Sequence, residues 1–557
     1  MASRTRAGLL SQGFRVPWMV ILPVPLRDRH GMASGIVLAI EPMVSTSRPS
    51  PHPALPAGSL RQADQGGSAP RREGRGPTHE WISTHRISAV IVGSLVASVF
   101  LGLVSGAVSP IVPGSVVASL IGIALAFLYP TLALAGTVGV IAILPFAVVP
   151  LRLGVAPTFL DILTAVVWAV WIVRLATGRD RVRFPAPVFM VCLATGVVVT
   201  SYLASPDPLS LDETARMFAK VSLGHLIVIP AAHLLRDRAS IHGLVGTVIV
   251  VTSIEAVIGI GLYLVPRDIA YRLLAALEPL GYPVGDNVLR YRPDTDILRA
   301  IGTSIDPNML GALLMTGGAL AIPQLLATHP IWPRPVTIAL LAPIAMGLLL
   351  TESRGSWLSL GAAVMIVGAL RYRRLWVVIG VAGALAVFLP QAQRFTEHLL
   401  SGLQAQDRAS SMRLDEIRNA YTIITGAPWI GVGWGIVGRS IDLEFTRGVS
   451  NIYLTIAQRS GIPALVAYLS VWVTIALGMW PAIRRASVEV RDDGIMLGGI
   501  GAIGGALVAG MVDHHFVSFP HLVTLLWALT GMVLARAAIN LDGTSVVNGA
   551  PQRASAK

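Results

Sequence analysis

The sequence contains very little cysteine, lysine and charge, and each shortage argues against a class of protein. Its 557 residues include a single cysteine, Cys192, so no intrachain disulfide can form and a cysteine-based metal site is not expected. Charged residues make up 13% of the chain and hydrophobic residues 54%, and the mean hydropathy is +0.68. A soluble chain of this length needs far more charge to cover its surface. The composition therefore predicts an integral membrane protein with polar tails.

The net charge is nevertheless +13, which in a soluble protein would suggest a nucleic-acid partner. Here the basic residues cluster between hydrophobic runs rather than along one soluble face. Nearly all of them are arginine, with lysine only at Lys220 and Lys557, which fits a bias in codon composition. We therefore expect no binding to nucleic acid.

Residues 1–86 are rich in proline, serine, glycine and arginine and are predicted to form a disordered, basic cytoplasmic tail. Their apolar pieces are too short to cross a bilayer, and initiation at Met32 or Met43 is an alternative that would shorten the tail. From Ile87 onward, apolar windows alternate with short polar connectors, as an all-α polytopic membrane protein requires. A spanning helix needs about 20 apolar residues, and this spacing predicts about 12–14 of them. The windows lie near 87–107, 112–129, 131–149, 157–175, 186–204, 221–235, 241–264, 308–327, 335–351, 355–370, 375–390, 452–480, 495–512 and 520–537.

Arginine is unevenly distributed between the connectors, and this predicts the orientation of the chain. Cytoplasmic loops carry an excess of basic residues, and the tail before Ile87 contains eleven arginines. Counted from that tail, the connectors 174–184, 236–238, 371–374 and 484–493 fall on the same side. Both termini are therefore expected in the cytoplasm, in a multi-pass inner- or plasma-membrane protein. The predicted parts are a tail (1–86), helices (87–264), an extracytoplasmic loop (265–307), helices (308–390), a large extracytoplasmic loop (391–450), helices (451–537) and a cytoplasmic tail (538–557).

The two long outer loops are unusual, because loops above about 15 residues are uncommon unless they are functional or disordered. In the second loop, Leu414, Ile417, Tyr421 and Ile424 recur at helical intervals. This pattern predicts an amphipathic helix that either lies on the membrane or packs against the helical bundle.

Three polar clusters are predicted to meet on the outer side. They lie in residues 299–311, residues 351–357, and the stretch from Arg413 to residue 461. An arginine at the bilayer centre costs about 2.5–3.5 kcal/mol, so Arg354 should lie at the interface or in a wet cavity. Several guanidinium groups around one cavity would suit a pyrophosphate. The alternatives are that Arg354 reaches lipid head groups and that Arg299 and Arg413 are solvated loop charges.

Three further acidic or histidine sites fall within or beside the spans. Asp161 follows a loop closely and is expected to cap a helix near the surface, whereas Glu255 lies deeper and would pair with an arginine or mark an ion path. Asp513, His514 and His515 end an outward-going span. A histidine beside a carboxylate can act as a general base, and solvated interfacial histidines are the alternative. Adjacent histidines on one turn point in different directions, which disfavours a zinc site.

In their order along the chain, these segments resemble the O-antigen ligase/polymerase superfamily of lipid-linked glycan enzymes. Family members show Arg-x-x-Gly…Pro-Asn, here Arg299–Asn308, and then Thr-x-Ser-Arg-Gly between spans, here Thr351–Gly355. A long outer loop with arginine and Gly-Val-Gly follows, here Arg413–Gly435. The last motif is His-Asn-x9-Gly, of which this chain has the Asn-x9-Gly part at Asn451–Gly461. The resemblance covers about residues 150–535 and rests on order, spacing and predicted sidedness together.

The resemblance implies a C-type glycosyltransferase-like fold without a metal or cofactor requirement. The donor would be an undecaprenyl-pyrophosphate-linked glycan, and the acceptor another lipid-linked glycan (polymerase) or a glycolipid anchor (ligase). The bilayer and polysaccharide assembly proteins would be its other partners. Arg354 and Arg413 would hold the pyrophosphate leaving group, with Arg299 as a third. With the histidine cluster included, the candidate catalytic residues are Arg354, Arg413, Ser450, Asn451 and His514, and the candidate substrate contacts are Arg299, Asn308, Arg418, Trp434 and Tyr453.

The chain departs from the family pattern at Ser450, which stands where the family has the histidine expected to activate the acceptor hydroxyl. A serine hydroxyl cannot accept that proton near neutral pH without help. Three interpretations follow. The base lies elsewhere, at His514, Glu444 or Asp442; the reaction depends less on a base because the leaving group is good; or the chain is not an active transferase.

Two functions of other classes remain open at this stage. A transporter or flippase would carry binding groups near the bilayer midplane and internal repeats, whereas the polar chemistry here concentrates in outer loops and no repeat between the halves is clear. A non-catalytic assembly partner is suggested by Ser450 alone.

Overall fold

The computed structural model describes residues 121–149, 157–182, 185–204, 213–285, 288–292, 296–388, 408–434, 449–488 and 494–548. Within these ranges the chain is almost entirely helical, and strand pairing is limited to two isolated β-bridges. The predicted all-α fold is therefore confirmed. The helices are α3 (Pro130–Ile143), α4 (Phe159–Ala176), α5 (Ala186–Leu203), α6 (Glu213–Leu226), α7 (Val228–Leu234), α8 (Arg238–Leu264), α9 (Arg267–Ala275), η1 (Glu278–Leu280), η2 (Gly302–Ser304), α10 (Pro307–Leu326), α11 (Arg334–Leu350), α12 (Arg354–Leu370), α13 (Arg374–Phe388), α15 (Arg408–Gly426), α16 (Ile452–Val488), α17 (Gly494–Ala509), α18 (His515–Ser518) and α19 (Pro520–Asn548).

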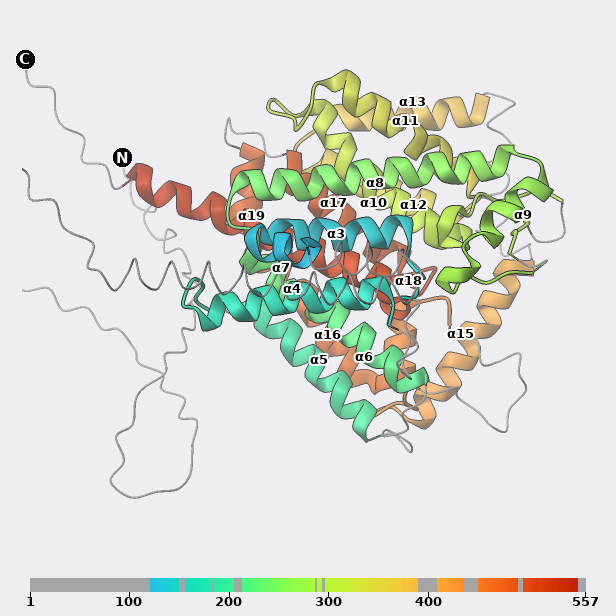
Figure 1. The fold of residues 1–557 in the computed structure, drawn as a ribbon, viewed down its shortest axis with the longest axis horizontal. Helices are drawn as coiled ribbons and strands as arrows, with labels where there is room; N and C mark the ends of the chain where they lie inside the picture. The colour runs from blue at the N-terminus through green and yellow to red at the C-terminus, as the bar shows by residue number, and fades with distance from the viewer. Residues whose placement is uncertain are drawn as a thin grey trace, which may run out of the picture. The chain divides into compact units, whose positions relative to one another are not determined.

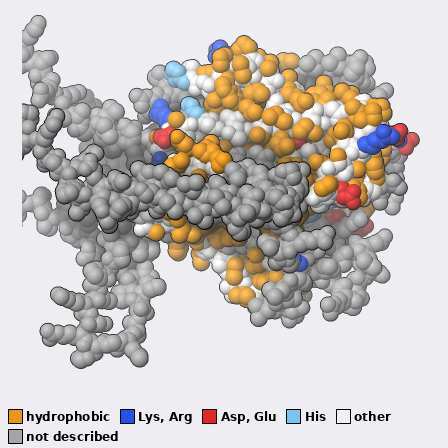
Figure 2. Space-filling view, viewed as in Figure 1, with side chains coloured by type: hydrophobic (Ala, Val, Ile, Leu, Met, Phe, Trp, Pro, Cys, Tyr) orange, Lys and Arg blue, Asp and Glu red, His pale blue; other side chains and the backbone are white. Residues whose placement is uncertain are grey.

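Seven helical segments in the described ranges are long and apolar enough to cross a membrane: Phe159–Ala176, Ala186–Leu203, Thr214–Leu234, Arg238–Leu264, Pro307–Leu326, Ile452–Arg484 and Pro520–Asn540. Four shorter apolar helices, α3, α11, α12 and α17, accompany them. Figure 2 shows one face of the surface that these helices form, where a broad apolar area lies between charged side chains gathered at its two ends. The predicted polytopic membrane architecture is confirmed, whereas the expected span at 87–107 and the first half of that at 112–129 lie outside the described residues.

The helices differ strongly in how far they are buried. In α10 and α19, 83% of the spanning window is inside the protein, against 28% in α4 and 33% in α16. Helix α17 contacts α10, α12 and α19, while α8 contacts α3, α10 and α11, and α16 contacts α5. Thus α10, α17 and α19 form the interior, and α4 and α16 present much of their surface to the surroundings (Figure 1).

Local sequence explains where the helices near the site begin. Asp306 accepts hydrogen bonds from the backbone N–H groups of Asn308 and Met309, at 2.8 and 3.0 Å, and Pro307 occupies the first turn, so α10 has both a side-chain cap and a preset φ. At α4, Thr158 and Asp161 form a reciprocal capping box, and Asp161 also pairs with Lys220 at 2.8 Å. The prediction that Asp161 caps a helix is confirmed.

Helix α16 is broken near its start by Gly461, which has φ 83°. A Cβ atom there would lie 2.4 Å from the carbonyl oxygen of Trp429, so only glycine permits this approach. The connector 428–434 docks against the break through three backbone hydrogen bonds of 2.7–3.0 Å, which join Ile462 N to Pro428 O, Val432 N to Gln458 O and Gly433 N to Arg459 O. The Gly-Val-Gly segment and the start of α16 therefore form one rigid unit.

Six chain segments meet at one end of the bundle. Helices α10, α12, α16 and α19 begin there, and α11 and α17 end there. Backbone hydrogen bonds of 2.8 Å join Ala300 N to Leu350 O and Ile452 N to Gly510 O, so the loops between these helices are held together. This end carries the polar residues that the sequence singles out.

Candidate active site

Arg299 ties two of the predicted polar clusters together. Its Nε donates to the carbonyl oxygen of Thr351 at 2.8 Å, and its Nη2 donates to Asn308 Oδ1 at 2.8 Å and to the carbonyl oxygen of Glu352 at 3.5 Å. The guanidinium thus connects the start of α10 to the tight turn between α11 and α12. That turn holds Glu352 at φ 52°, and Arg354 is the first residue of α12.

The charges of two further guanidinium groups, those of Arg354 and Arg413, act on Arg299 at this end. Burial is the main cause that lowers the pKa of Arg299 to about 10, and the nearby charges of Arg354 and Arg413 lower it further, against Asp306 and Glu352. Burial raises the pKa of Glu352. The charges of Arg292 and Arg299 oppose this rise, and the Nη1 atom of Arg292 lies 3.9 Å from Glu352 Oε2. Clustered cations in a partly buried site repel one another, so the arrangement favours an anion with several oxygens.

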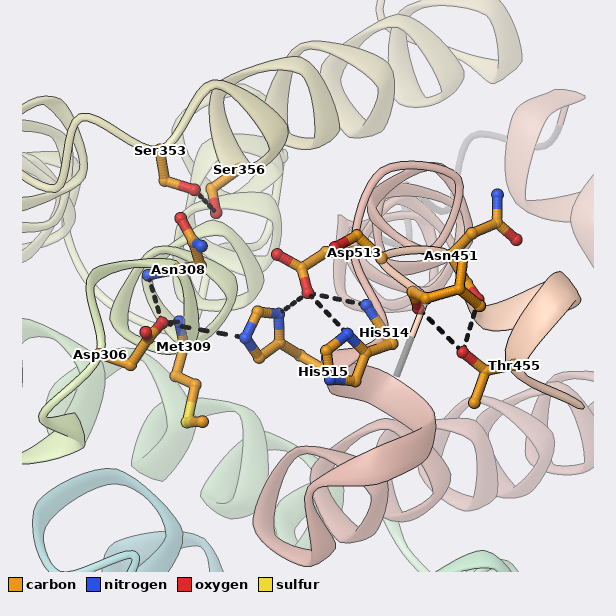
Figure 3. A network of polar contacts seen from close by, with 12 residues as sticks. Asp306, Asn308, Met309, Ser353, Ser356, Asn451, Thr455, Asp513, His514 and His515 are labelled. Atoms are coloured by element: carbon orange, nitrogen blue, oxygen red, sulfur yellow. Dashed lines mark hydrogen bonds and ion pairs between the residues drawn. The ribbon is translucent and has the colours of Figure 1, made fainter. Parts of the chain in front are cut away.

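A second network, of histidines and carboxylates, reaches Asp306 at the start of α10, close to Asn308, the residue that Arg299 contacts (Figure 3). Asp513 forms a hydrogen-bonded ion pair with His515 Nδ1, and His515 Nε2 lies 3.8 Å from Asp306 Oδ1. Asp513 also accepts a hydrogen bond from the backbone N–H of His514 at 2.7 Å. The imidazole rings of His514 and His515 stack with centroids 5.4 Å apart. His515 is thus held between two carboxylates, and His514 lies against it.

The surroundings of these side chains determine which of them are charged at neutral pH. Burial lowers the pKa of His514 to about 4, with help from His515 and Arg459, so its ring is neutral. Burial lowers the pKa of His515 as well, but Asp513 and Asp306 outweigh it and raise the pKa above the usual value. For Asp513, burial raises the pKa, and His515, His514 and Arg413 outweigh it and hold the pKa at about 2. The site therefore pairs a neutral imidazole with an ionised carboxylate and a second, more basic imidazole.

Ser450 and Asn451 lie next to this network. The side-chain amide of Asn451 donates to the carbonyl oxygen of Met511 at 2.9 Å, two residues before Asp513. The backbone N–H of Ser450 donates to Glu416 Oε2 on α15 at 2.9 Å. The position that carries histidine in the family pattern therefore lies close to the turn that carries His514 and His515.

The three remaining predicted substrate contacts have partners other than the arginines and histidines of the site. Arg418 is exposed on α15 and pairs with Asp415 at 3.2 Å. Trp434 Nε1 donates to Ser460 Oγ at 3.0 Å under the guanidinium of Arg459, and the Tyr453 hydroxyl donates to the carbonyl oxygen of Leu507 at 2.9 Å. These three residues have structural partners of their own. Two alternative bases, Asp442 and Glu444, fall outside the described residues.

Glu255 is fully buried in α8, and its partner is a threonine rather than an arginine. Its Oε1 accepts hydrogen bonds from Thr303 N at 2.7 Å and Thr303 Oγ1 at 3.0 Å. Gly302 makes room for this contact, because a Cβ there would lie 2.2 Å from the Glu255 carboxylate. Since η2 lies between Arg299 and Asp306 in sequence, Glu255 holds the segment that carries both site residues.

Sequence reasoning did not single out three parts of this arrangement. In the sequence, His515 and Asp306 belong to separate polar clusters, and no pattern marks Glu416. The Asp-Pro pair that opens α10 is a typical helix-cap signal, and it could have placed Asp306 at the bundle end. No signal in the sequence pairs His515 with Asp306, because that contact joins residues more than 200 positions apart. Within the described ranges, no group of three or more His, Cys, Asp or Glu side chains is arranged to hold a metal ion.

Comparison with known proteins bears directly on this end of the bundle. Residues 338–469 match the family model Wzy_C, described as O-antigen ligase. This stretch of the chain is therefore similar to an O-antigen ligase domain. The predicted resemblance to the O-antigen ligase/polymerase superfamily is thereby confirmed, and together with the apolar helices the match points to a multi-pass inner-membrane protein. The matched range of this domain includes Arg354, Arg413, Ser450 and Asn451.

The other comparisons add little to this identification. A chain from the solved structure described as "Structural coordination of polymerization and crosslinking by a peptidoglycan synthase complex" is 18% identical, and the alignment covers 64% of this chain and 97% of that chain with a TM-score of 0.37. The comparison with curated proteins gives no match.

Proposed function

We propose that this protein is a glycosyltransferase that moves a glycan from an undecaprenyl-pyrophosphate carrier to a sugar hydroxyl of an acceptor glycan or glycolipid. The observation that carries the proposal is the convergence of Arg299, Arg354 and Arg413 at one end of the bundle, beside a neutral imidazole. A pyrophosphate would place several negatively charged oxygens against the three guanidinium groups, and arginine matches phosphate oxygens through its planar fork of N–H donors.

The arginines have two parts in this scheme. Arg354 and Arg413 bind the pyrophosphate and stabilise the charge that grows on it as the glycosidic bond breaks. Arg299 is held by Thr351 and Asn308, so it sets the shape of the site and contributes charge with little freedom to move. The arginine distribution predicts the orientation of the chain in the membrane, and we adopt it in this scheme. The site then faces the extracytoplasmic leaflet, and both termini lie in the cytoplasm.

His514 is the proton acceptor in the scheme, in place of the histidine that Ser450 replaces. Its neutral ring lies in the same turn as Asp513, close to Asn451. The acceptor oxygen attacks the anomeric carbon, the bond from that carbon to the pyrophosphate oxygen breaks, and the acceptor proton passes to His514. The pyrophosphate leaves with the bonding electron pair, held by the arginines. Asp513 and His515 fix the position of His514 and do not take the proton.

The reaction class is tested by the glycan profile of a deletion strain complemented with variants. Wild-type protein should restore glycan extension, and Arg354→Ala and Arg413→Ala should not, although both still insert in the membrane. Single repeat units that accumulate on the carrier would indicate a polymerase, and long chains that accumulate on the carrier would indicate a ligase. Normal glycan length and amount in both variants would reject the proposal, and substrate accumulation in proteoliposomes without glycosyl transfer would favour a transporter or flippase.

A further inference from the structure

Helix α15 has three sides with different chemistry. The first side packs against the rest of the protein: Ala420 is buried, and Glu416 accepts the hydrogen bond from Ser450. The second side is polar and exposed, and it carries the Asp415–Arg418 ion pair. The third side is apolar and exposed, with Leu414 at 45%, Ile417 at 42% and Tyr421 at 68% of their full accessible areas. Such a pattern is typical of a helix that contacts the protein on one side, water on the second and apolar surroundings on the third.

The apolar side continues into the surface of a spanning helix. Trp429, 77% exposed, follows α15, and its neighbour Pro428 accepts a hydrogen bond from Ile462 of α16 at 2.7 Å. From there an exposed apolar row runs along α16 at helical intervals. The row consists of Ile462, Val466, Leu469, Val473 and Leu477 and ends at Trp480, whose ring lies 5.1 Å from the Arg484 guanidinium.

The length of this row matches the thickness of a bilayer. From Ile462 to Trp480 the helix rises about 27 Å at about 1.5 Å per residue, and the hydrocarbon core of a bilayer is about 30 Å thick. Tryptophan is enriched at both membrane interfaces, and one tryptophan lies at each end of the row. The boundary of the hydrocarbon near the site therefore lies at Trp429, beside the end of α15. Figure 1 shows α15 running obliquely to the long helices at this end of the bundle.

From this geometry we propose that α15 is a membrane-surface helix, whose side formed by Leu414, Ile417 and Tyr421 lies in the interfacial layer of the bilayer. Lipid is the occupant because the apolar side is continuous with the lipid-facing row of α16 and ends at an interfacial tryptophan. One consequence rests on the proposed function. Arg413, next to Leu414, lies at the depth of lipid phosphate groups, so a lipid-borne pyrophosphate reaches the site by lateral movement within the leaflet.

Adjacent residues on two sides of α15 provide a matched test. In a Cys192→Ala background, which removes the single native cysteine, Ile417→Cys and Arg418→Cys are each spin-labelled in the full-length protein. Leu477→Cys serves as the control for lipid exposure, and Tyr421→Cys replaces Ile417→Cys if that variant does not fold. Each protein is reconstituted in vesicles of phosphatidylethanolamine and phosphatidylglycerol. Electron paramagnetic resonance then compares label collisions with oxygen, which is enriched in lipid, and with a water-soluble nickel chelate.

The proposal predicts that the label at position 417 resembles the Leu477 control, with a high ratio of oxygen to nickel collisions, whereas the label at position 418 favours nickel. Two results would overturn it. Equal access of nickel to positions 417 and 418 would place this side in water, and protection of position 417 from both reagents would mean that protein, such as a second copy of the chain, covers it. The spin-label experiment does not depend on glycosyl transfer, so a failure of this proposal is distinguishable from a failure of the proposed reaction.

Discussion

The Nε2 atom of His515 lies 3.8 Å from Oδ1 of Asp306, although the two residues come from distant parts of the chain. Asp306 caps α10, whose second residue, Asn308, accepts a hydrogen bond from Arg299. On its other side, His515 pairs with Asp513, the residue before His514. A continuous set of polar contacts therefore joins an arginine of the proposed pyrophosphate site to the proposed proton acceptor.

The central imidazole of this set should contribute strongly to stability. His515→Phe leaves the buried carboxylate of Asp513 without its main partner, and breaking a buried pair in this way costs about 3–5 kcal/mol. Denaturation in detergent measures the free energy of unfolding. The double variant His515→Phe, Asp513→Asn removes both charges and should lose less than the sum of the two single variants. Strictly additive losses would mean that the pair is not coupled.

The pH dependence of transfer should identify His514 as the proton acceptor. Only a neutral imidazole accepts a proton, and burial lowers the pKa of His514 to about 4. Activity carried by this group should therefore be constant down to weakly acidic pH and fall as the pH drops through about 4. An unperturbed histidine would instead lose activity near pH 6.5. Rates of the transfer step from purified protein between these pH values distinguish the two cases.

The size of the His514 contribution is tested by substitution. His514→Gln keeps a polar side chain but no basic nitrogen, and it should reduce the transfer rate by about 10²–10⁴-fold with donor affinity nearly unchanged. If His514→Gln transfers at the wild-type rate, another group accepts the proton or the reaction needs no base.

The sequence predicts the membrane architecture well because the relevant signal is local. Each apolar window needs only its own 20 or so residues to be recognised, and the expected spans from 157–175 onward all coincide with helices in the described ranges. The family motifs likewise mark Arg354, Arg413 and Asn451 through short patterns, and the roles of these residues stay predictions. Contacts between such patterns are a different matter, because they depend on how the helices pack.

Trp434 and Arg418 show what pattern alone cannot resolve. Both lie in segments that the family resemblance marks as functional, yet Trp434 packs beside Ser460 and Arg459, and Arg418 is exposed and pairs with Asp415. The rotation of α15 about its axis decides which of its arginines meets the site. Arg413 and Arg418 are five residues apart and so project to different sides. Only packing of the helix fixes that rotation.

The docking of connector 428–434 on α16 should depend on one glycine. Gly461→Ala places a methyl group against the carbonyl of Trp429 and forces a non-glycine residue into φ 83°, so we expect a loss of more than about 1 kcal/mol and faster proteolysis within the connector. Gly426→Ala is the matched control, since a Cβ atom there meets nothing within 4 Å. Equal proteolysis of the two variants would contradict a role for Gly461 in holding the connector.

The central claim is that Arg354 and Arg413 bind the pyrophosphate of a lipid-linked donor, and transfer from a purified polyprenyl-pyrophosphate-linked glycan in proteoliposomes tests it most directly. Arg334→Ala, at the other end of the bundle, is the control and should transfer at the wild-type rate. Loss of a donor that stabilises a developing oxyanion costs about 10²–10³-fold, so Arg354→Ala and Arg413→Ala should each lose at least that much. Wild-type transfer rates in both variants would contradict the account.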